Sequence, residues 1–491
     1  MIIPDRDSVV LRELASQAFS RAAGAPLVAG NSVRLLKDAA QNYPAWLEAI
    51  QTASRSILFD SYIVHEDEIG YAFADELIAK AREGITVRLV YDWLGALNAT
   101  SRAFWNRLRA GGVQVRCFNP PQVTQPLGWV SRDHRKMLAV DGRVGFVTGL
   151  CIGRMWVGDP ARGLDPWRDT GVEVRGPAVA DIERAFAQVW AMIGEPIAEN
   201  ELACGTSIPD AGEKTLRVIA NVPSTTKIFR LDQLVCALAR KSLWLTDAYY
   251  AGTAPYVQAL RAAAADGVDV RLLVPGATDI PVLRPLSRAG FRPLLDAGVR
   301  VFEWNGSMLH AKTAVADGVW ARVGSSNLNI ASWMGNCELD VAVEDTEFGK
   351  QMEDMYVEDL KNSTELVLDS KFRTRSLGVP APHAQAAGYG SAGRATTGML
   401  RIGNAVGAAI TGHRELGPVE AQLMITAGML FLAIAIVMGL WPAIVLYPAV
   451  VIAVWFGAAF LYNGWSLYRK RKRSSALSVP RPAGSAQAGH R

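Results

Sequence analysis

HRKMLAVD at residues 134–141 and HAKTAVAD at residues 310–317 follow one pattern, His-x-Lys-x4-Asp. The two copies are 176 residues apart, since 310 − 134 and 317 − 141 both equal 176. The chain has only six histidines, and two of them occupy the same position of this pattern. We therefore predict a duplicated chain whose two halves each contribute one part of a single site.

Each copy has the features of a strand that leads into a tight turn. Side chains alternate between the two faces of a strand, so the histidine and the lysine of each copy point the same way. The apolar residues 137–140 suit a buried strand, and Asp141-Gly142 and Asp317-Gly318 are strong indicators of hairpin turns. The two aspartates are expected to support these turns rather than to contact substrate. The candidate motif residues are His134, Lys136, Asp141, His310, Lys312 and Asp317.

A histidine beside a lysine on one rigid face suits the chemistry of a phosphodiester. The cation offsets charge on the non-bridging oxygens, while the histidine acts as nucleophile or as acid and base. We assign His134 as the nucleophile and His310 as the acid and base, although the symmetry of the two motifs leaves the opposite assignment open. Lys136 and Lys312 are expected to bind the phosphate. A single His-x-Lys is more often a solvent-facing pair, but its duplication in register favours the catalytic interpretation.

The sequence after each motif offers further polar side chains. Ser325 and Asn327, in GSSN, are expected to donate hydrogen bonds to phosphate oxygens. Glu338 is the candidate for holding the histidine of its own half in one tautomer. In the first half Asp169 is the candidate for the same task.

With these motifs the sequence resembles the phospholipase D superfamily, and most closely its cardiolipin synthase-type phosphatidyltransferases. The resemblance extends from about residue 25 to about residue 365. Beyond the motifs it is carried by GAPLVAGNSVRLL (24–36), SYIVHEDEIG (61–70), YDWLG (91–95), WRDT (167–170), GVDVRLLVPGATD (267–279) and FRPLLDAGVRVFEW (291–304). It implies a two-lobed α/β fold with pseudo-twofold symmetry, no metal or other cofactor, and a covalent phosphohistidine intermediate.

One stretch departs from the pattern of that branch. Where the branch usually has Gly-Gly-x-Asn after the first motif, this chain has Thr148-Gly149-Leu150-Cys151. Cys151 stands where Asn327 stands in the other half, since 327 − 151 = 176. A thiol is a weak donor compared with an amide, so one phosphate contact is expected to be lost, with Thr148 as the candidate to supply a hydroxyl instead. Cys151 is more simply interpreted as a small packed residue than as a reactive one.

The composition argues against several classes of protein. The formal net charge is only +4 over 491 residues, which does not predict a broad basic surface for nucleic acid. The five cysteines lie far apart without a Cys-x-x-Cys pair, which argues against a zinc site and a disulfide framework and fits a reducing compartment. The N-terminal stretch carries mixed charges and no apolar run, so it does not predict a signal peptide.

Strand-like and helix-like segments alternate in both halves, with glycines at helix ends. This alternation indicates an α/β fold with a largely parallel sheet in each lobe. The loop-like stretch 199–213 separates the halves, so we predict lobes at residues 1–205 and 206–370. Residues 371–420 are rich in Gly, Ala, Pro and Thr, which predicts a flexible linker.

The C-terminal part of the chain has the composition of a membrane segment. Residues 421–468 contain no Asp, Glu, Lys or Arg over 48 positions (468 − 421 + 1). A single helix of that length would measure about 72 Å against a hydrocarbon core of about 30 Å, so we predict two transmembrane helices within 421–463. A disordered tail, 464–491, carries the basic cluster 469–473, which predicts contact with anionic headgroups of the inner membrane. The positive-inside rule places this end, and with an even number of spans the lobes, in the cytoplasm.

Several functions remain open from the sequence alone. The leading hypothesis is a membrane-anchored phosphatidyltransferase that makes cardiolipin from phosphatidylglycerol. A hydrolytic phospholipase D would use the same intermediate with water as acceptor, so the sequence does not separate the two. A nuclease is disfavoured by the near-neutral charge and the predicted anchor. A non-catalytic lipid-binding scaffold has only Cys151 in its support, and the oligomeric state is not assigned.

Overall fold

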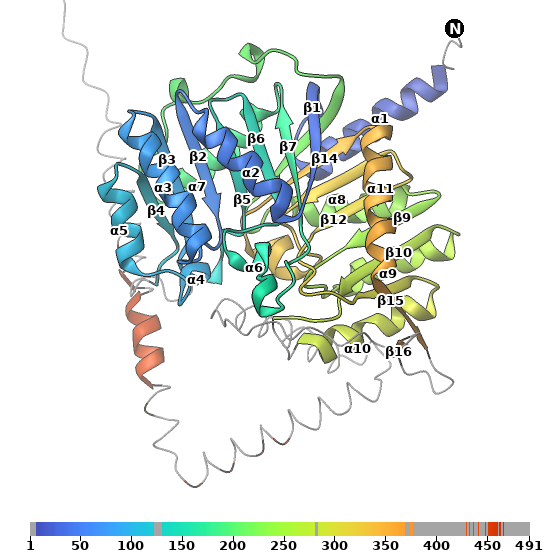
Figure 1. The fold of residues 1–491 in the computed structure, drawn as a ribbon. Helices are drawn as coiled ribbons and strands as arrows, with labels where there is room; N and C mark the ends of the chain where they lie inside the picture. Colours follow the sequence, from blue (N-terminus) through green and yellow to red (C-terminus); the bar gives the residue numbers. More distant parts are fainter. Residues whose placement is uncertain are drawn as a thin grey trace, which may run out of the picture. The chain divides into compact units, whose positions relative to one another are not determined.

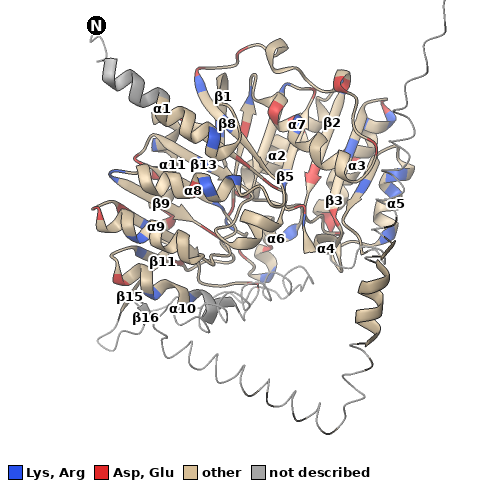
Figure 2. Ribbon diagram, turned by 180° about the vertical axis from the view of Figure 1, so that it is seen from behind, with Lys and Arg blue, Asp and Glu red and all other residues tan. Residues whose placement is uncertain are grey.

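The computed structural model describes residues 6–121, 130–279, 283–368 and 374–376, the helical run 450–459 and separate positions between 429 and 465. The two halves of the chain lie in one compact unit, which contains the described residues 6–120 and 130–376 (Figure 1). A second unit contains residues 121–129 and 425–491. Basic and acidic residues are interspersed along the helices and strands of both halves (Figure 2).

One sheet of 16 strands runs through both halves. The strands are β1 (Val28–Lys37), β2 (Ser56–Ser61), β3 (Thr86–Asp92), β4 (Gln114–Phe118), β5 (Lys136–Val140), β6 (Val144–Thr148), β7 (Thr170–Arg175), β8 (Lys214–Asn221), β9 (Ser242–Thr246), β10 (Asp269–Pro275), β11 (Arg300–Trp304), β12 (Thr313–Ala316), β13 (Trp320–Gly324), β14 (Glu338–Glu344), β15 (Ser363–Leu368) and β16 (Thr374–Ser376). Strands β1 and β8 pair at the junction. On its two sides the orders β7-β6-β5-β2-β3-β4 and β14-β13-β12-β9-β10-β11 correspond strand for strand, as the duplicated motif predicts.

The prediction of a largely parallel sheet in each lobe is wrong. Strands β2, β3 and β4 are parallel, but β5, β6 and β7 are antiparallel to their neighbours, and the second half repeats this arrangement. The reason lies in the motif itself, because a two-residue turn can join only antiparallel strands. Asp141 and Gly142 have φ of 57° and 67°, and Asp317 and Gly318 have 54° and 65°. Positive φ at both positions is typical of a type I′ hairpin turn.

Helices cover both faces of the sheet. The helices are α1 (Arg6–Ala23), α2 (Asp38–Gln51), α3 (Glu68–Arg82), α4 (Trp93–Ala96), α5 (Arg102–Ala110), α6 (Arg154–Val157), α7 (Val179–Met192), α8 (Lys227–Leu238), α9 (Ala254–Ala265), α10 (Leu283–Asp296), α11 (Thr346–Lys361) and the π-helix η5 (Ala331–Gly335). Buried apolar residues of α2, α3 and α5 form one core cluster, and those of α8, α9 and α10 form another. A third cluster contains residues of α7 and α11 and the strand side chains on the other face of the sheet.

Residues 19–25, placed in the first lobe by sequence, contribute to the core of the second half. Ala23 and Ala25 are buried in the same cluster as Ile228 and Leu231 of α8, with Phe19 packed against it. The division at residue 205 therefore does not describe the N-terminal helix, whose apolar face packs on the other half of the chain.

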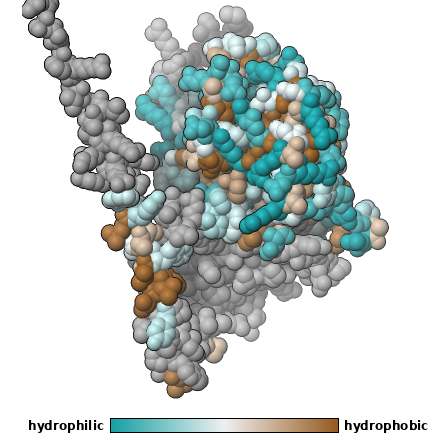
Figure 3. All heavy atoms as spheres, turned by 90° about the vertical axis from the view of Figure 1, so that its left-hand side faces the viewer, coloured by the Kyte–Doolittle hydropathy of each residue, from teal (hydrophilic) through white to brown (hydrophobic). Residues whose placement is uncertain are grey.

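The predicted linker, membrane hairpin and basic tail lie almost wholly outside the described residues. Among the residues that the structure does describe, no helix has both the length and the apolar character that crossing a bilayer requires. The described run 450–459 is helical, and apolar side chains in it, such as Val451 and Val454, are exposed. In Figure 3 brown, hydrophobic atoms lie along this helix, and the face of the two halves that is in view is a mixture of teal, white and brown.

Candidate active site

The two motifs meet at the boundary between the halves. His134 lies just before β5, and His310 lies just before β12. The His134 N–H donates to the Cys337 carbonyl of the second half (2.9 Å). In the same way the His310 N–H donates to the Arg168 carbonyl of the first half (2.7 Å). Each motif histidine is thus tied through its backbone to the half to which it does not belong.

The carboxylate partners of the two histidines are crossed between the halves. Nδ1 of His134 lies 2.9 Å from Oε2 of Glu338, and Nδ1 of His310 lies 2.7 Å from Oδ2 of Asp169. The expectation that each carboxylate holds the histidine of its own half is therefore wrong. The backbone bridges explain the exchange, because Glu338 and Asp169 directly follow the residues whose carbonyls accept from the histidine N–H groups. With Nδ1 bound, Nε2 is the ring nitrogen available to substrate.

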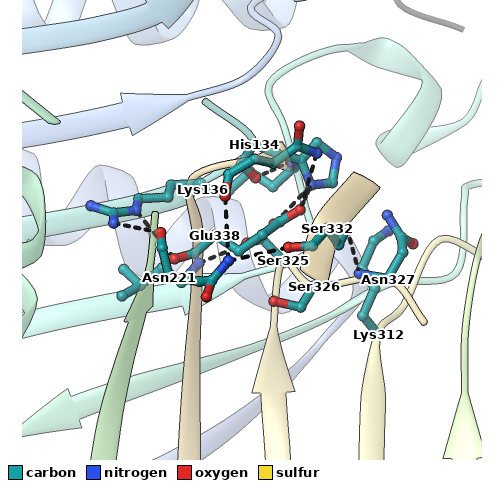
Figure 4. Close-up of polar contacts among 12 residues, drawn as sticks. His134, Lys136, Asn221, Lys312, Ser325, Ser326, Asn327, Ser332 and Glu338 are labelled. Carbon is teal, nitrogen blue, oxygen red and sulfur yellow. Dashed lines mark hydrogen bonds and ion pairs between the residues drawn. The ribbon is translucent and has the colours of Figure 1, made fainter. Parts of the chain in front are cut away.

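Further groups hold each carboxylate in place. Glu338 accepts hydrogen bonds from the Ser325 hydroxyl (2.5 Å) and the Asn336 amide (3.4 Å), so His134 and Ser325 converge on it (Figure 4). Ser325 therefore binds the carboxylate, whereas the sequence predicted that it donates a hydrogen bond to a phosphate oxygen. Asp169 accepts from the Trp156 indole N–H (3.1 Å).

The two lysines are bound in matching ways. Each Nζ donates to the carbonyl of its own motif histidine, at 2.5 Å for Lys136, with the equivalent contact made by Lys312. The Lys136 ammonium lies 5.0 Å from the ring centroid of Tyr62, and that of Lys312 lies 5.8 Å from Tyr249. These contacts fix two cations beside the two histidines, as binding of a phosphodiester requires.

One pocket contains both histidines. Its lining residues are Tyr62, Ile63, Arg132, His134, Lys136, Cys151, Met155, Trp156, Trp167, Tyr249, Asp279, His310, Asn327, Asn329, Ala331, Ser332 and Asn336. Asn327 and Cys151, at corresponding positions of the two halves, both belong to this lining. Cys151 is 1% exposed, and burial raises the pKa of its thiol, which keeps it protonated. Within the described residues no group of three or more His, Cys, Asp or Glu side chains could hold a metal ion.

Three of the predicted site residues lie away from the pocket. The Thr148 hydroxyl donates to the Thr170 carbonyl (3.3 Å) and accepts from Leu150 N–H (3.0 Å), so it is not placed to replace a phosphate contact. Asp141 accepts from the backbone N–H groups of residues 54–56, and Asp317 from those of residues 240–242. Both aspartates therefore bind the start of a neighbouring strand, which agrees with a supporting role.

The electrostatics of the site keep both histidines neutral. Burial, and then the charge of Lys312, lower the pKa of His310 to about 3. Burial also lowers the pKa of His134, although Glu338 opposes the shift. Burial lowers the pKa of Lys312 to about 8. A neutral imidazole has the free lone pair that a nucleophile needs, whereas an acid needs a second proton.

An anion bound between the lysines should raise the pKa of His310. The anion offsets the positive charge of Lys312, and we expect the pKa to rise by about one unit or more. Titration of the histidine ring signals by NMR, with and without inorganic phosphate, measures the shift. An unchanged His310 titration at saturating phosphate would show that the anion binds elsewhere.

Sequence reasoning missed a buried ion pair that supports the site. Arg168, 3% exposed, donates from Nε and Nη2 to the two carboxylate oxygens of Asp359 in α11, at 2.9 and 2.8 Å. Its Nη1 also reaches Asp38 (3.1 Å), which accepts from the N–H of Asp169 (2.9 Å). The pair joins the halves next to His310. No local pattern connects residues that are 191 positions apart. The aromatic rings of Trp156, Trp167 and Tyr249 around His310 were also missed.

Two His-x-Lys half-sites, joined across a duplicated α/β sheet and each held by a carboxylate of the other half, define an enzyme of the phospholipase D type. Residues 46–190 and 236–360 match the family described as cardiolipin synthase, PLD-like domain. The chain belongs to this family, the cardiolipin synthase-type branch of the phospholipase D superfamily, and the resemblance predicted from the motifs is confirmed.

Individual relatives agree with this assignment. The chain is 33% identical over 347 residues to a cardiolipin synthase of Alkalihalophilus pseudofirmus, covering 70% of this chain and 68% of the relative. It is 32% identical over 372 residues to cardiolipin synthase A of Pseudomonas syringae, covering 74% and 75%. The crystal structure of phosphatidylserine synthase from Haemophilus influenzae superposes with a TM-score of 0.58 at 13% identity, covering 79% of this chain and 98% of that one. This last likeness supports the fold.

Proposed function

We propose that the chain is a phosphatidyltransferase that makes cardiolipin from two molecules of phosphatidylglycerol. The observation that carries the proposal is the pair of histidines in one pocket, each with Nδ1 bound to a carboxylate and each beside a lysine. This arrangement provides a nucleophile, an acid and base, and two cations for one phosphodiester. The relatives named cardiolipin synthase point to the same reaction.

In the first step of the proposed mechanism, Nε2 of His134 attacks the phosphorus of a donor phosphatidylglycerol. A nitrogen–phosphorus bond forms, the bond from phosphorus to the headgroup oxygen breaks, and His310 gives its Nε2 proton to the departing glycerol. Glu338 holds the Nδ1–H of His134 so that Nε2 carries the lone pair. Free His310 is neutral and its Nδ1–H is held by Asp169, so it takes up a second proton, at Nε2, from solvent when the substrate binds. The negative charge of the bound phosphodiester favours this uptake, because it opposes the positive charge of Lys312.

In the second step an acceptor hydroxyl reacts with the phosphohistidine. His310 takes the hydroxyl proton, the new oxygen–phosphorus bond forms and the bond from His134 to phosphorus breaks. The sum of the two steps is two phosphatidylglycerol molecules converted to one cardiolipin and one glycerol. Water in place of the acceptor would give phosphatidic acid by the same route.

We also propose that residues 421–463 anchor the enzyme in the cytoplasmic membrane, with the catalytic halves on the cytoplasmic side. The proposal is supported by the 48 uncharged positions from 421 to 468 and by the exposed apolar side chains of the helical run 450–459. The basic cluster 469–473 would bind anionic headgroups. Such an anchor keeps the pocket at the headgroup plane.

Product analysis tests the proposed reaction directly. The full-length protein is given labelled phosphatidylglycerol in mixed micelles that contain a chelator, and the lipids are separated. We expect cardiolipin and an equimolar amount of released glycerol. Phosphatidic acid without cardiolipin would identify a hydrolase, and a protein that binds the lipid without turnover would be a scaffold.

A further inference from the structure

We infer that Asp38 is a positioning residue for His310 and that it acts through the backbone of Asp169. The inference rests on the proposed transferase function and adds a residue on which its acid and base chemistry depends. Asp38 is the first residue of α2, and it belongs neither to the two motifs nor to the lining of the pocket.

Asp38 binds both polar groups of the Asp169 backbone. The Asp38 N–H donates to the Asp169 carbonyl (3.0 Å), and Oδ1 of the Asp38 carboxylate accepts from the Asp169 N–H (2.9 Å). The last pair of the β1–β7 ladder is Lys37 and Thr170, so Asp38 and Asp169 face each other one position beyond it. Asp38 therefore fixes the backbone of the residue whose carboxylate holds His310.

The backbone of Asp38 has a conformation that residues other than glycine rarely adopt. Its φ is 55°, in the left-handed region. The chain turns here from β1 into α2, and the Asn42 amide binds the carbonyls of Leu36 and Asp38 across this bend, at 3.1 and 2.9 Å. Backbone strain of this kind is concentrated at functional sites. A contribution of the Asp38 side chain to function provides a reason for an acid where glycine would be less strained.

A balanced group of charges holds the Asp38 carboxylate in place. The buried Arg168 guanidinium donates to Asp38 from Nη1 (3.1 Å) and to both carboxylate oxygens of Asp359 (2.9 and 2.8 Å). The Lys37 ammonium lies 3.5 Å from Asp359, so two cations face two carboxylates. Charge-assisted hydrogen bonds to a planar guanidinium have a defined geometry, so they restrict the position of Asp38.

The position of the Asp169 backbone decides whether its carboxylate reaches His310. Oδ2 of Asp169 accepts from the Nδ1–H of His310 (2.7 Å) and from the indole N–H of Trp156 (3.1 Å). Hydrogen bonds of this length weaken steeply when donor and acceptor move apart or out of line. Without the two Asp38 contacts the Asp169 backbone is free to shift, and the support that its carboxylate gives to protonated His310 should weaken.

The second half holds its carboxylate without a charged partner. Glu338 is paired in the β8–β14 ladder with the uncharged Asn221. The side-chain amide of Asn221 binds the carbonyls of Ser332, Trp333 and Asn336. The duplicated fold alone therefore does not require an acid at position 38. The reaction provides a reason for the difference, because His310 must carry a second proton as the acid, whereas His134 attacks as a neutral base.

The test compares two donor lipids that differ in their need for an acid. The glycerol of phosphatidylglycerol needs a proton from His310 to depart, whereas the p-nitrophenolate of phosphatidyl-p-nitrophenol departs without one. For each full-length variant, the rate of glycerol release from the first donor is divided by the rate of the p-nitrophenol burst from the second. We expect Asp38→Gly to lower this ratio about tenfold or more, a loss typical of hydrogen bonds to a charged group. The ratio does not depend on how much of each variant is folded.

Glycine is the informative replacement because it adopts positive φ without strain, so the bend is kept while the carboxylate is lost. Asp38→Asn keeps an oxygen that accepts from the Asp169 N–H but loses the charge that faces Arg168, so its ratio should lie between those of wild type and Asp38→Gly. Asn98→Gly is the matched control, at an exposed residue whose φ is 63°, and it should keep the wild-type ratio.

The outcomes separate this inference from the proposed reaction. A wild-type ratio in Asp38→Gly, or an equal decrease in Asn98→Gly, would overturn the positioning role and leave the transferase intact. Phosphatidic acid in place of cardiolipin would overturn the transferase proposal, while the glycerol released with it would still measure the ratio. A wild type that releases neither glycerol nor p-nitrophenol would overturn both.

Discussion

Alanine in place of either motif histidine should abolish turnover of phosphatidylglycerol. His134→Ala removes the proposed nucleophile and His310→Ala removes the acid and base, so we expect each to lower kcat by about a thousandfold or more. Cardiolipin formation by purified variants measures the loss, with His383→Ala, outside both motifs, as the control. Near wild-type turnover in either motif variant would contradict a mechanism with two half-sites.

A donor with a good leaving group distinguishes the two histidines. In phosphatidyl-p-nitrophenol the leaving group departs as a stable phenolate, so it needs no proton from an acid. His310→Ala should therefore release p-nitrophenol in a burst, while His134→Ala should not. The opposite result would exchange the two roles.

Removing the charge of either carboxylate partner should cost about a hundredfold or more in kcat. Asp169→Asn and Glu338→Gln keep the shape of the side chains but no longer stabilise the tautomer that each histidine needs, as with the aspartate of a catalytic triad. Cardiolipin formation again measures the effect. Asp340→Asn, a buried acid two residues from Glu338 on β14 that binds Ser326, is the matched control.

The crossed pairing makes this prediction specific. Asp169 binds His310, so Asp169→Asn should resemble His310→Ala and release p-nitrophenol from the activated donor. Glu338 binds His134, so Glu338→Gln should resemble His134→Ala and fail to do so. If Asp169→Asn instead behaved like His134→Ala, and Glu338→Gln like His310→Ala, the geometry of the site would be contradicted.

The sequence was sufficient to predict the duplication and that the two motif histidines, His134 and His310, meet in one pocket. A periodic strand pattern, an Asp-Gly turn and a repeated His-x-Lys are local features, and local features specify which face of a strand a side chain occupies. The chemical types at His134, Lys136, His310 and Lys312, repeated at one spacing, therefore indicate phosphodiester chemistry by themselves.

Local features did not predict how the two halves are joined. Glu338 follows the second motif within the same half of the chain, yet it binds His134 of the first half. Ser325 has a hydroxyl that could bind phosphate, yet this hydroxyl donates its hydrogen bond to Glu338. In both cases the outcome depends on a backbone hydrogen bond between segments that are distant in the sequence. No periodic pattern in either segment indicates such a bond.

By itself, the sequence determined two similar α/β halves and a pair of histidines and lysines with the chemistry of phosphodiester transfer or hydrolysis. Only the tertiary structure decided which carboxylate holds which histidine, and that Arg168 and Asp359 join the halves. Hydrogen bonds and ion pairs reach about 3 Å, whereas these partners are up to 204 positions apart in the chain, so only the fold can bring them together.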